Sequence, residues 1–512
     1  MIHKNYFSKI MMLCVAIVAM SMTMLTSCSS NEDNSSSNAS FVDPYQEYWQ
    51  DKTAKYTIML YGCGGGNVDT QLTGAIPFIQ QRLNVETNQV RFVVMYSMSK
   101  DDSMYREEAK KEGQTYTGPF DPGYGALGET YRYELTPYIT EENYRENGYY
   151  KQASEVKLYD VETIKEFINW AKETAPAENY ILIPTNHGGG FDLDGEQMEQ
   201  MPEVMPEDSH KTRAIVYDDN QDGRGIPTKV FAQALKETNT HLKAVYWNGC
   251  MMSQLEVMTE IAPYCDYQFG GAHVQRALPR HSYAIVEALN TYPDNFEQAA
   301  LLQSEILNAP KTEYEYGLSD ALIDSEDPMK NANGDFGCWR SAGLAAINAQ
   351  VKELADVVTK GYADSDTKGK IDNATSSVYM FDKEYNYVDV LDYALHIYYN
   401  LKTPEAEEIY LNLEKALEEA KVYQICCLNR KIVATDGEAV YTKWPATDRY
   451  SLGISLYSCL NLRWLYYNSV YKASAFDKVT GWSKFIDMNL QELDPNVNPA
   501  NDSNITPFWM AD

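Results

Sequence analysis

The stretch that decides the fold is residues 241–272, HLKAVYWNGCMMSQLEVMTEIAPYCDYQFGGA. It begins with a short β-rich run (241–250), continues with apolar residues at helical spacing (252–264), and ends with a second short β-rich run (266–272). This order predicts a strand, a helix and a second strand. Because a helix between two strands usually joins parallel neighbours, the stretch indicates an α/β fold.

The same alternation extends toward the N-terminus. Further strands are expected at 56–62, 90–98, 179–190 and 214–219, with helices at 71–83, 161–175 and 227–237. Residues 102–130 are polar and rich in Gly and Tyr, which favours a long loop or a hairpin insertion. The pattern predicts a mostly parallel sheet with helices on both faces, and in such sheets the chemistry lies beyond the carboxyl ends of the strands.

The pattern changes after about residue 290. Longer helical stretches are expected at 294–308, 341–362 and 404–421, followed by short β-like runs at 450–458 and 467–486. The sequence contains no internal repeat and no long Pro/Ser linker. We therefore predict an α/β domain over residues 49–292 and an α+β region over residues 293–512 that packs on it.

The N-terminus is typical of an exported bacterial lipoprotein. Two lysines precede an apolar run over residues 10–25, which is shorter than a typical membrane-spanning helix and leads into Cys28. The sequence Leu-Thr-Ser-Cys resembles a lipobox, in which the cysteine is lipidated. A buried N-terminal helix, the alternative, would need an amphipathic pattern. We expect a signal peptide over 1–28, a flexible tether over 29–48, and a body anchored to the outer membrane or cell surface.

The charge and the cysteine spacing exclude some classes of function. The 512 residues carry 43 Lys plus Arg and 73 Asp plus Glu, a formal net charge of −30. With no basic patch, the chain would repel nucleic acids and anionic lipid headgroups. Of the nine cysteines, Cys14 and Cys28 belong to the leader, and the remaining seven have no CxxC or metal-ligand spacing. An odd number leaves at least one free thiol unless it pairs between chains.

Two of the predicted strands end in a reactive side chain beside glycine. One run reaches His187 before three glycines, and another ends at Cys250. In a Cys–His dyad, His187 would assist thiolate formation or protonate the leaving amine, and Cys250 would attack a carbonyl to form an acyl-enzyme. The N–H groups of Gly188 and Cys250 would form the oxyanion hole. Each signal alone is weak, since a His-Gly run also ends strands and a free cysteine is often a small buried hydrophobe.

Taken together, these blocks resemble the clostripain family of cysteine peptidases, in the caspase-like clan. The resemblance covers about residues 50–490 and rests on YTIMLYGCGGGNVDTQL (56–72), ILIPTNHGGGF (181–191), AIVYDDNQDGRGIPTKVFAQAL (214–235), AVYWNGCMMSQLEVMTEIAPYCDYQFGG (244–271), LGISLYS (452–458) and TGWSKFI (480–486). It implies a caspase-like α/β/α sandwich with a mostly parallel sheet and a C-terminal α+β extension. It also implies that His187 and Cys250 are the catalytic dyad of an endopeptidase.

The chain departs from the family at the position two residues before Cys250. Clostripain-like enzymes usually have Asp there, and the carboxylate helps the S1 pocket select Arg or Lys, whereas this sequence has Asn248. Asparagine removes the charge, so a neutral or acidic P1 residue becomes conceivable. Arg276 and Arg280, which follow the next strand, are further candidates for this substrate pocket.

Family members are often matured by self-cleavage between the His and Cys strands. Here residues 191–213 are long, acidic and Met-rich, which is typical of an exposed loop. Lys211 and Arg213 are its only basic residues, so cleavage after one of them is our hypothesis. An uncleaved surface loop is the alternative.

A short acidic motif that begins at Asp218 partly matches a calcium-binding loop. Asp218, Asn220 and Asp222 match the first half of an EF-hand loop, but its twelfth position is Lys229 instead of Glu. A true EF-hand is therefore not expected, and the alternative is a solvated acidic turn. Some relatives respond to calcium, so a calcium requirement stays open; no other metal or cofactor is expected.

The sequence thus predicts an exported, lipid-anchored cysteine endopeptidase that acts as a monomer on proteins or peptides. One alternative is a non-catalytic surface binding lipoprotein on a peptidase-like scaffold, which Asn248 mildly favours. Another is a carbohydrate-capturing lipoprotein, suggested by the anchor and by the 40 tyrosines.

Overall fold

The computed structural model describes residues 43–63, 72, 74–101, 127–140, 143–145, 148–191, 215–221, 223–272, 280–308, 336–382, 387–425, 432–433, 439–440, 453–458 and 464–490. The described residues from Tyr45 onward belong to one compact unit. The predicted signal peptide and Cys28 lie outside the described residues. Residues 44–48, expected to be tether, belong to helix α2 (Pro44–Trp49), which buries Tyr45 and Trp49. No helix in the described ranges is long and apolar enough to span a membrane.

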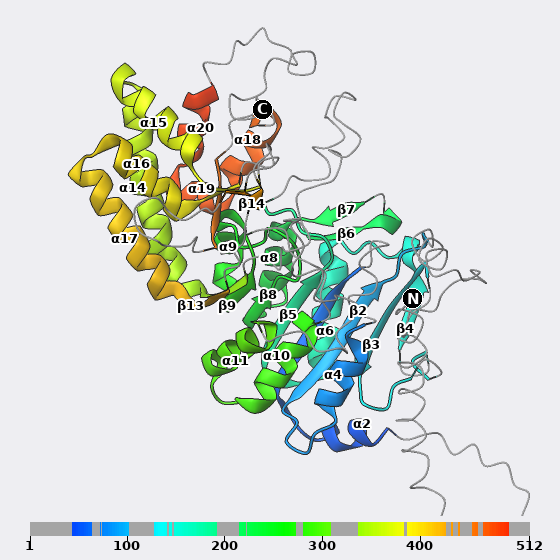
Figure 1. Ribbon diagram of the computed structural model, residues 1–512. Coiled ribbons are helices and arrows are strands. Elements are labelled where there is room, and N and C mark those ends of the chain that lie inside the picture. Colours follow the sequence, from blue (N-terminus) through cyan, green and yellow to red (C-terminus); the bar gives the residue numbers. More distant parts are fainter. Residues whose placement is uncertain are drawn as a thin grey trace, which may run out of the picture. The chain divides into compact units, whose positions relative to one another are not determined.

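A central sheet forms the middle of this unit (Figure 1). Its described strands follow the order β13-β10-β9-β8-β5-β1-β2-β3-β4. Their bounds are β1 Ala54–Cys63, β2 Val90–Ser97, β3 Glu129–Leu135, β4 Tyr149–Gln152, β5 Ala177–Thr185, β8 Leu242–Tyr246, β9 Cys265–Gly270, β10 Phe336–Arg340 and β13 Lys421–Ile425. The five strands from β9 to β2 are parallel, and two antiparallel strands extend the sheet at each edge.

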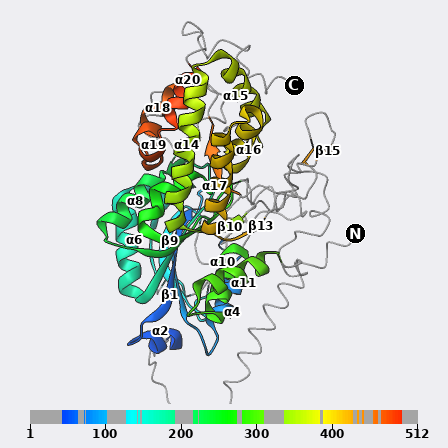
Figure 2. The ribbon, with the colours of Figure 1, turned by 90° about the vertical axis from the view of Figure 1, so that its left-hand side faces the viewer.

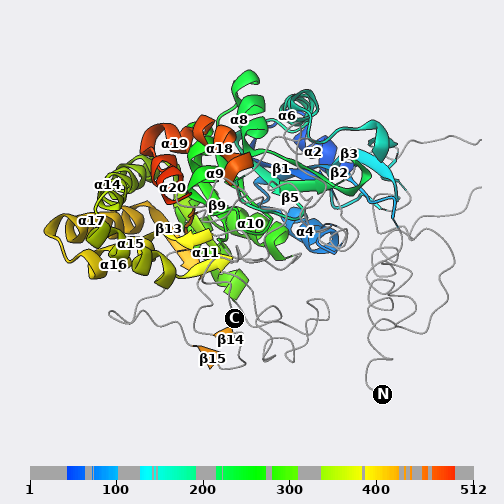
Figure 3. The ribbon, with the colours of Figure 1, turned by 90° about the horizontal axis from the view of Figure 1, so that it is seen from above.

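Helices cover both faces of the sheet, as Figure 3 shows from above. One layer contains α6 (Val161–Thr174), α8 (Thr228–Glu237) and α9 (Leu255–Ile261), and the other contains α4 (Ile76–Leu83), α10 (Arg280–Thr291) and α11 (Phe296–Asn308). Successive side chains of a strand point to opposite faces. In β1, Met59 and Tyr61 therefore pack with the first layer, and Ile58 and Leu60 with the second. This confirms the predicted α/β architecture with helices on both faces.

The C-terminal region adds helices and a small sheet. The helices are α14 (Leu344–Tyr362), α15 (Ser365–Ser377), α16 (Val390–Leu401), α17 (Pro404–Ala420), α18 (Trp464–Ala473), α19 (Ala475–Thr480) and α20 (Ser483–Leu490). Figure 2 shows α14, α16 and α17 side by side. The small antiparallel sheet consists of β11 (Met380–Asp382), β12 (Tyr387–Asp389) and β16 (Ser455–Tyr457). Because β10 and β13 also belong to residues 293–512, this region shares the central sheet instead of only packing on it.

One local expectation was wrong, and one predicted strand lies outside the central sheet. The run 467–486, expected to be β-like, is helical, because Ser474 caps the start of α19 and Gly481, with φ of 65°, ends it. The run 214–219 does form a strand, β6 (Ile215–Asp218), but β6 pairs with β7 (Arg224–Ile226) outside the central sheet. Two further short strands, β14 (Ile432–Val433) and β15 (Ala439–Val440), pair with each other.

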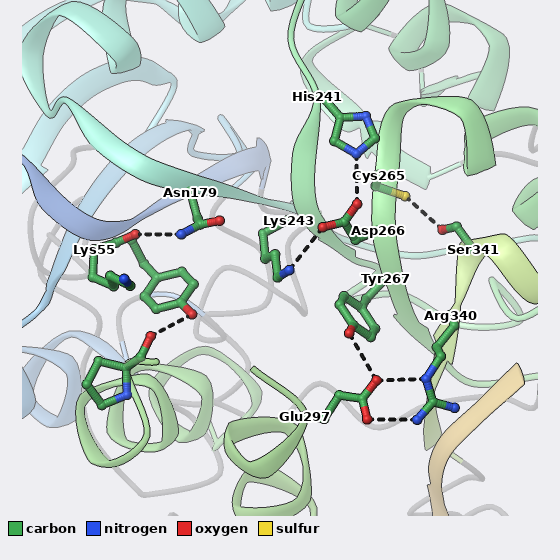
Figure 4. A network of polar contacts seen from close by, with 12 residues as sticks. Lys55, Asn179, His241, Lys243, Cys265, Asp266, Tyr267, Glu297, Arg340 and Ser341 are labelled. Carbon is green, nitrogen blue, oxygen red and sulfur yellow. Dashed lines mark hydrogen bonds and ion pairs between the residues drawn. The ribbon is translucent and has the colours of Figure 1, made fainter. Parts of the chain in front are cut away.

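A polar network ties the strands together at the amino ends of β8 and β9 (Figure 4). His241 and Lys243 both contact the carboxylate of Asp266, at 2.9 and 3.0 Å. Nearby, Glu297 of α11 makes a two-point ion pair with Arg340 of β10, at 2.7 and 2.8 Å. His187 and Cys250 follow the carboxyl ends of β5 and β8, so these charged groups lie at the other edge, away from the candidate site.

Candidate active site

The two turns that carry His187 and Cys250 lie side by side at the carboxyl edge of the sheet. Their strands, β5 and β8, are parallel neighbours. The pairing continues past the strands: Thr185 and Asn248 form a parallel bridge, and the N–H of Asn248 donates to the carbonyl of Pro184 at 3.0 Å. The backbones of the two turns are therefore neighbours at one edge of the sheet.

Gly188, directly after His187, touches the backbone of Cys250. A Cβ added to Gly188 would lie 2.3 Å from the carbonyl O and 2.7 Å from the N of Cys250. No side chain can occupy that space, so glycine is required for the two turns to approach each other. His187 itself is exposed and Cys250 is half-buried, which leaves both side chains within reach of a substrate.

Asn186, immediately before His187, fixes the start of this turn, and no sequence motif predicts its role. Its side-chain NH₂ donates to the carbonyl of Cys63 at 2.7 Å, and its Oδ1 accepts the N–H of Tyr217 at 3.1 Å. Asn186 is only 2% exposed, so these bonds are shielded from water. They join the ends of β1, β5 and β6 immediately before His187. In the sequence, the available signal was an amide residue at the end of an apolar strand run, directly before His187.

On the other turn, the backbone bends sharply after Cys250. Met251 has φ of 57°, in the left-handed region that residues with a side chain rarely adopt. Met251 and Met252 are both buried and belong to different core clusters. The packing of these two side chains therefore holds the turn in place before α9 begins at Leu255.

The described thiols differ in accessibility. Cys63, Cys265 and Cys338 are buried, whereas Cys250 is half-buried. Burial raises the pKa of Cys265 to about 12 and that of Cys338 well above its usual value, so neither forms a thiolate readily at neutral pH. Among the cysteines that the structure describes, Cys250 is thus the best placed to react. Cys426, Cys427 and Cys459 lie outside the described residues.

The predicted pocket residues are only partly described. Asn248 is 7% exposed, and its side-chain NH₂ donates to Thr185 Oγ1 at 2.8 Å. Arg276 lies outside the described residues, and Arg280 is the first residue of α10, with its side chain not described. The predicted processing residues Lys211 and Arg213 also lie outside the description.

The acidic motif forms the turn between β6 and β7. The Asp218 carboxylate accepts the N–H of Asn220 at 3.0 Å. The side chain of Asn220 in turn donates to Ser97 and Met98 and accepts the N–H of Lys100. Asp222 is not described. In the described part of the chain, no group of three or more His, Cys, Asp or Glu side chains could hold a metal ion.

Comparisons with known proteins agree with this architecture. The sequence profile of the clostripain family matches residues 139–488. Two solved structures of a secreted C11 cysteine protease from Bacteroides thetaiotaomicron resemble the chain, each with a TM-score of 0.51. The one called iotapain is 12% identical and covers 84% of this chain and 100% of its own. The other, in complex with an irreversible peptide inhibitor, is 14% identical and covers 83% and 99%. A search of curated proteins found no match.

Proposed function

Because the chain belongs to the clostripain family and is a cysteine peptidase, we propose that it cleaves internal peptide bonds with Cys250 as nucleophile and His187 as general acid and base. One observation carries this assignment: Gly188, the residue after His187, contacts the backbone of Cys250 too closely for any side chain. The two reactive groups therefore extend from turns that are fixed against each other.

The proposed reaction has two steps. The Cys250 thiolate attacks the carbonyl carbon of the scissile bond, and the N–H groups of Gly188 and Cys250 donate to the oxygen as it gains negative charge. The C–N bond then breaks, and His187 gives a proton to the leaving amine. In the second step, His187 removes a proton from water, water attacks the thioester, and the Cys250 thiolate leaves.

The proposed substrate pocket differs from that of a peptidase specific for basic residues. Asn248 stands at the position expected to read the P1 side chain, and it brings a neutral amide there. The pocket, with Arg276 and Arg280 as further members, would therefore not favour Arg or Lys through an ion pair. Because this pocket would not favour basic residues, self-cleavage after Lys211 or Arg213 is a separate proposal. The intact masses of the wild type and of Cys250→Ala test it.

We further propose export and anchoring through a lipid on Cys28. The apolar leader and the lipobox-like sequence support it, and the two solved structures of similar fold are of a protease described as secreted. In this proposal the body acts as a monomer on protein or peptide substrates, without a cofactor. A calcium requirement through Asp218, Asn220 and Asp222 is tested by activity with and without a chelator.

A peptide-library cleavage profile tests the proposed function. We expect cleavage by the wild type, loss of cleavage in Cys250→Ala and strong reduction in His187→Ala, with both variants folded by circular dichroism. Full cleavage by Cys250→Ala would contradict the proposed dyad of Cys250 and His187. A wild type that cleaves no peptide and yet binds ligands would favour the alternative of a surface binding lipoprotein.

A further inference from the structure

Two buried side chains from distant parts of the sequence hold the turn that follows His187. The hydroxyl of Tyr387, in β12, donates to the carbonyl of Gly189 at 2.6 Å. The side-chain Oε1 of Gln254, immediately before α9, accepts the N–H of Phe191 at 2.5 Å. Tyr387 is 1% exposed and Gln254 is 0% exposed, so water does not compete for either bond. We call Tyr387 and Gln254 the loop clamp.

Gly190 lies between the two members of the loop clamp. A Cβ added there would lie 2.5 Å from Gln254 Oε1 and 2.8 Å from the hydroxyl O of Tyr387. Gly190 also has φ of 78°, which favours glycine. The turn is thus fitted to the loop clamp by shape as well as by hydrogen bonds.

Both members of the loop clamp are joined to one small sheet. Tyr387 belongs to β12, which pairs with β16. Gln254 forms a bridge with Ser455 of β16, and the N–H of Ser455 donates to the carbonyl of Ser253 at 2.9 Å. The small sheet of the C-terminal region therefore contacts the turn after His187 and, through residues 253 and 254, the segment that follows Cys250.

Phe191 adds an apolar contact to the same arrangement. Its ring packs edge to face against Tyr471 of α18, with ring centroids 5.5 Å apart. The hydroxyl of Tyr471 donates to the buried carboxyl of Glu256 in α9, at 2.7 Å. The turn after His187 and the helix after Cys250 are thus also linked through the C-terminal helices.

From these contacts we propose that Tyr387 and Gln254 are positioning residues for the peptidase reaction. They fix the glycine run so that His187 and the Gly188 N–H keep their places relative to Cys250. Three consecutive glycines have wide conformational freedom, and a displacement of about 1 Å at a reacting group costs on the order of 100-fold in rate. The inference rests on the proposed dyad of Cys250 and His187. It makes the C-terminal region a part of the catalytic framework.

Tyr387→Phe tests the proposal because it removes a single hydroxyl. Tyr56→Phe is the matched control: Tyr56 is also buried, and its hydroxyl donates to the carbonyl of Pro293 at 2.9 Å, at the opposite edge of the sheet. We expect Tyr387→Phe to lower kcat for a peptide substrate about tenfold with KM nearly unchanged, because orientation is lost while binding is kept. Tyr56→Phe should keep the wild-type kcat. Equal kcat values for the two variants would overturn the proposal.

The pH dependence of alkylation gives a second readout that a merely structural role would not change. The rate at which iodoacetamide modifies Cys250 follows its thiolate fraction, which depends on where His187 lies. We expect the midpoint of this profile to shift in Tyr387→Phe and not in Tyr56→Phe. If the wild type turned over no peptide, the proposed function would fail. Independently of that result, identical alkylation profiles for the wild type and Tyr387→Phe would overturn the positioning role of the loop clamp.

Discussion

Gly188 and Cys250 are packed so closely that a methyl group on Gly188 would overlap the backbone of Cys250, 2.3 Å from its carbonyl oxygen. This contact joins two turns whose strands are neighbours in the central sheet. It places the backbone next to His187 against the backbone of Cys250, although the two residues are far apart in the sequence. The spacing of the His187 turn and the Cys250 turn is therefore set by backbone contact.

Gly188→Ala should separate the two turns. The added methyl group must displace either the His187 turn or the Cys250 turn, and we expect kcat/KM for peptide hydrolysis to fall by about 100-fold or more. Gly369→Ala is the control, because Gly369 lies in α15 with nothing within 4 Å of an added Cβ. That variant should keep full activity. Wild-type kinetics in Gly188→Ala would show that the contact does not set the geometry.

Asn186→Ala should weaken both activity and stability. It removes the hydrogen bonds to Cys63 and Tyr217 and leaves their buried backbone groups without them. We expect about 1–3 kcal/mol less free energy of unfolding and a fall in kcat of about tenfold.

Asn290→Ala is the matched control for Asn186→Ala. Asn290 bridges two backbone groups in the same way, accepting the N–H of Gln89 at 2.8 Å and donating to the carbonyl of Arg82 at 2.9 Å, but away from the site. Denaturant unfolding and steady-state kinetics on both variants separate the two effects. An equal loss of stability with no difference in kcat would show that Asn186 only supports the fold.

The part of the site that the sequence predicts is the part encoded locally. A β-rich run followed by His187 and glycine, or by Cys250, is visible in one short window, and parallel pairing then brings such strand ends to one edge. Asn186 and Tyr387 act through partners 31 and 198 positions away, Tyr217 and Gly189. No local periodicity encodes such contacts, so they become visible only in the fold.

The differences between the predicted and the observed fold have the same origin. The run 467–486 contains aromatic and β-branched residues, yet capping at Ser474 and Gly481 makes it helical. The run 214–219 has the composition of a core strand, but its partner is β7 and not a strand of the central sheet. Composition gave the correct local type of the second run, and tertiary contacts decided its place.

Asn248→Asp should shift the P1 preference toward basic residues. The variant supplies the carboxylate that Asn248 lacks, and a buried ion pair with an Arg or Lys side chain favours such substrates. We expect the ratio of kcat/KM for basic over neutral P1 peptides to rise at least about tenfold, which corresponds to about 1.4 kcal/mol. Asn248→Ala controls for loss of the bond to Thr185. An unchanged ratio would place the P1 side chain elsewhere.

Glu256 should make stability depend on pH. Burial raises the pKa of its carboxyl from 4.5 to about 7, while hydrogen bonds from Tyr471 and Tyr457 oppose the shift and the charge of Asp477 adds to it. Between these pH values the folded chain keeps a proton that the unfolded chain has released. The free energy of unfolding contributed by Glu256 is therefore full below pH 4.5 and falls as the pH rises through 7.

Glu256→Gln removes this dependence. The variant should be more stable than the wild type above pH 7 by on the order of 3 kcal/mol, and the difference should vanish near pH 4.5. Urea unfolding of both proteins across pH 4.5 to 8 measures it. Parallel stability curves would mean that Glu256 has an ordinary pKa in the folded chain.

The most direct test of the central claim is covalent labelling with a peptide-based irreversible inhibitor of cysteine peptidases, followed by intact mass and peptide mapping. The account predicts one adduct, located on Cys250, that is absent from Cys250→Ala and forms much more slowly in His187→Ala. An adduct on any other cysteine, or full peptide turnover by Cys250→Ala, would contradict it.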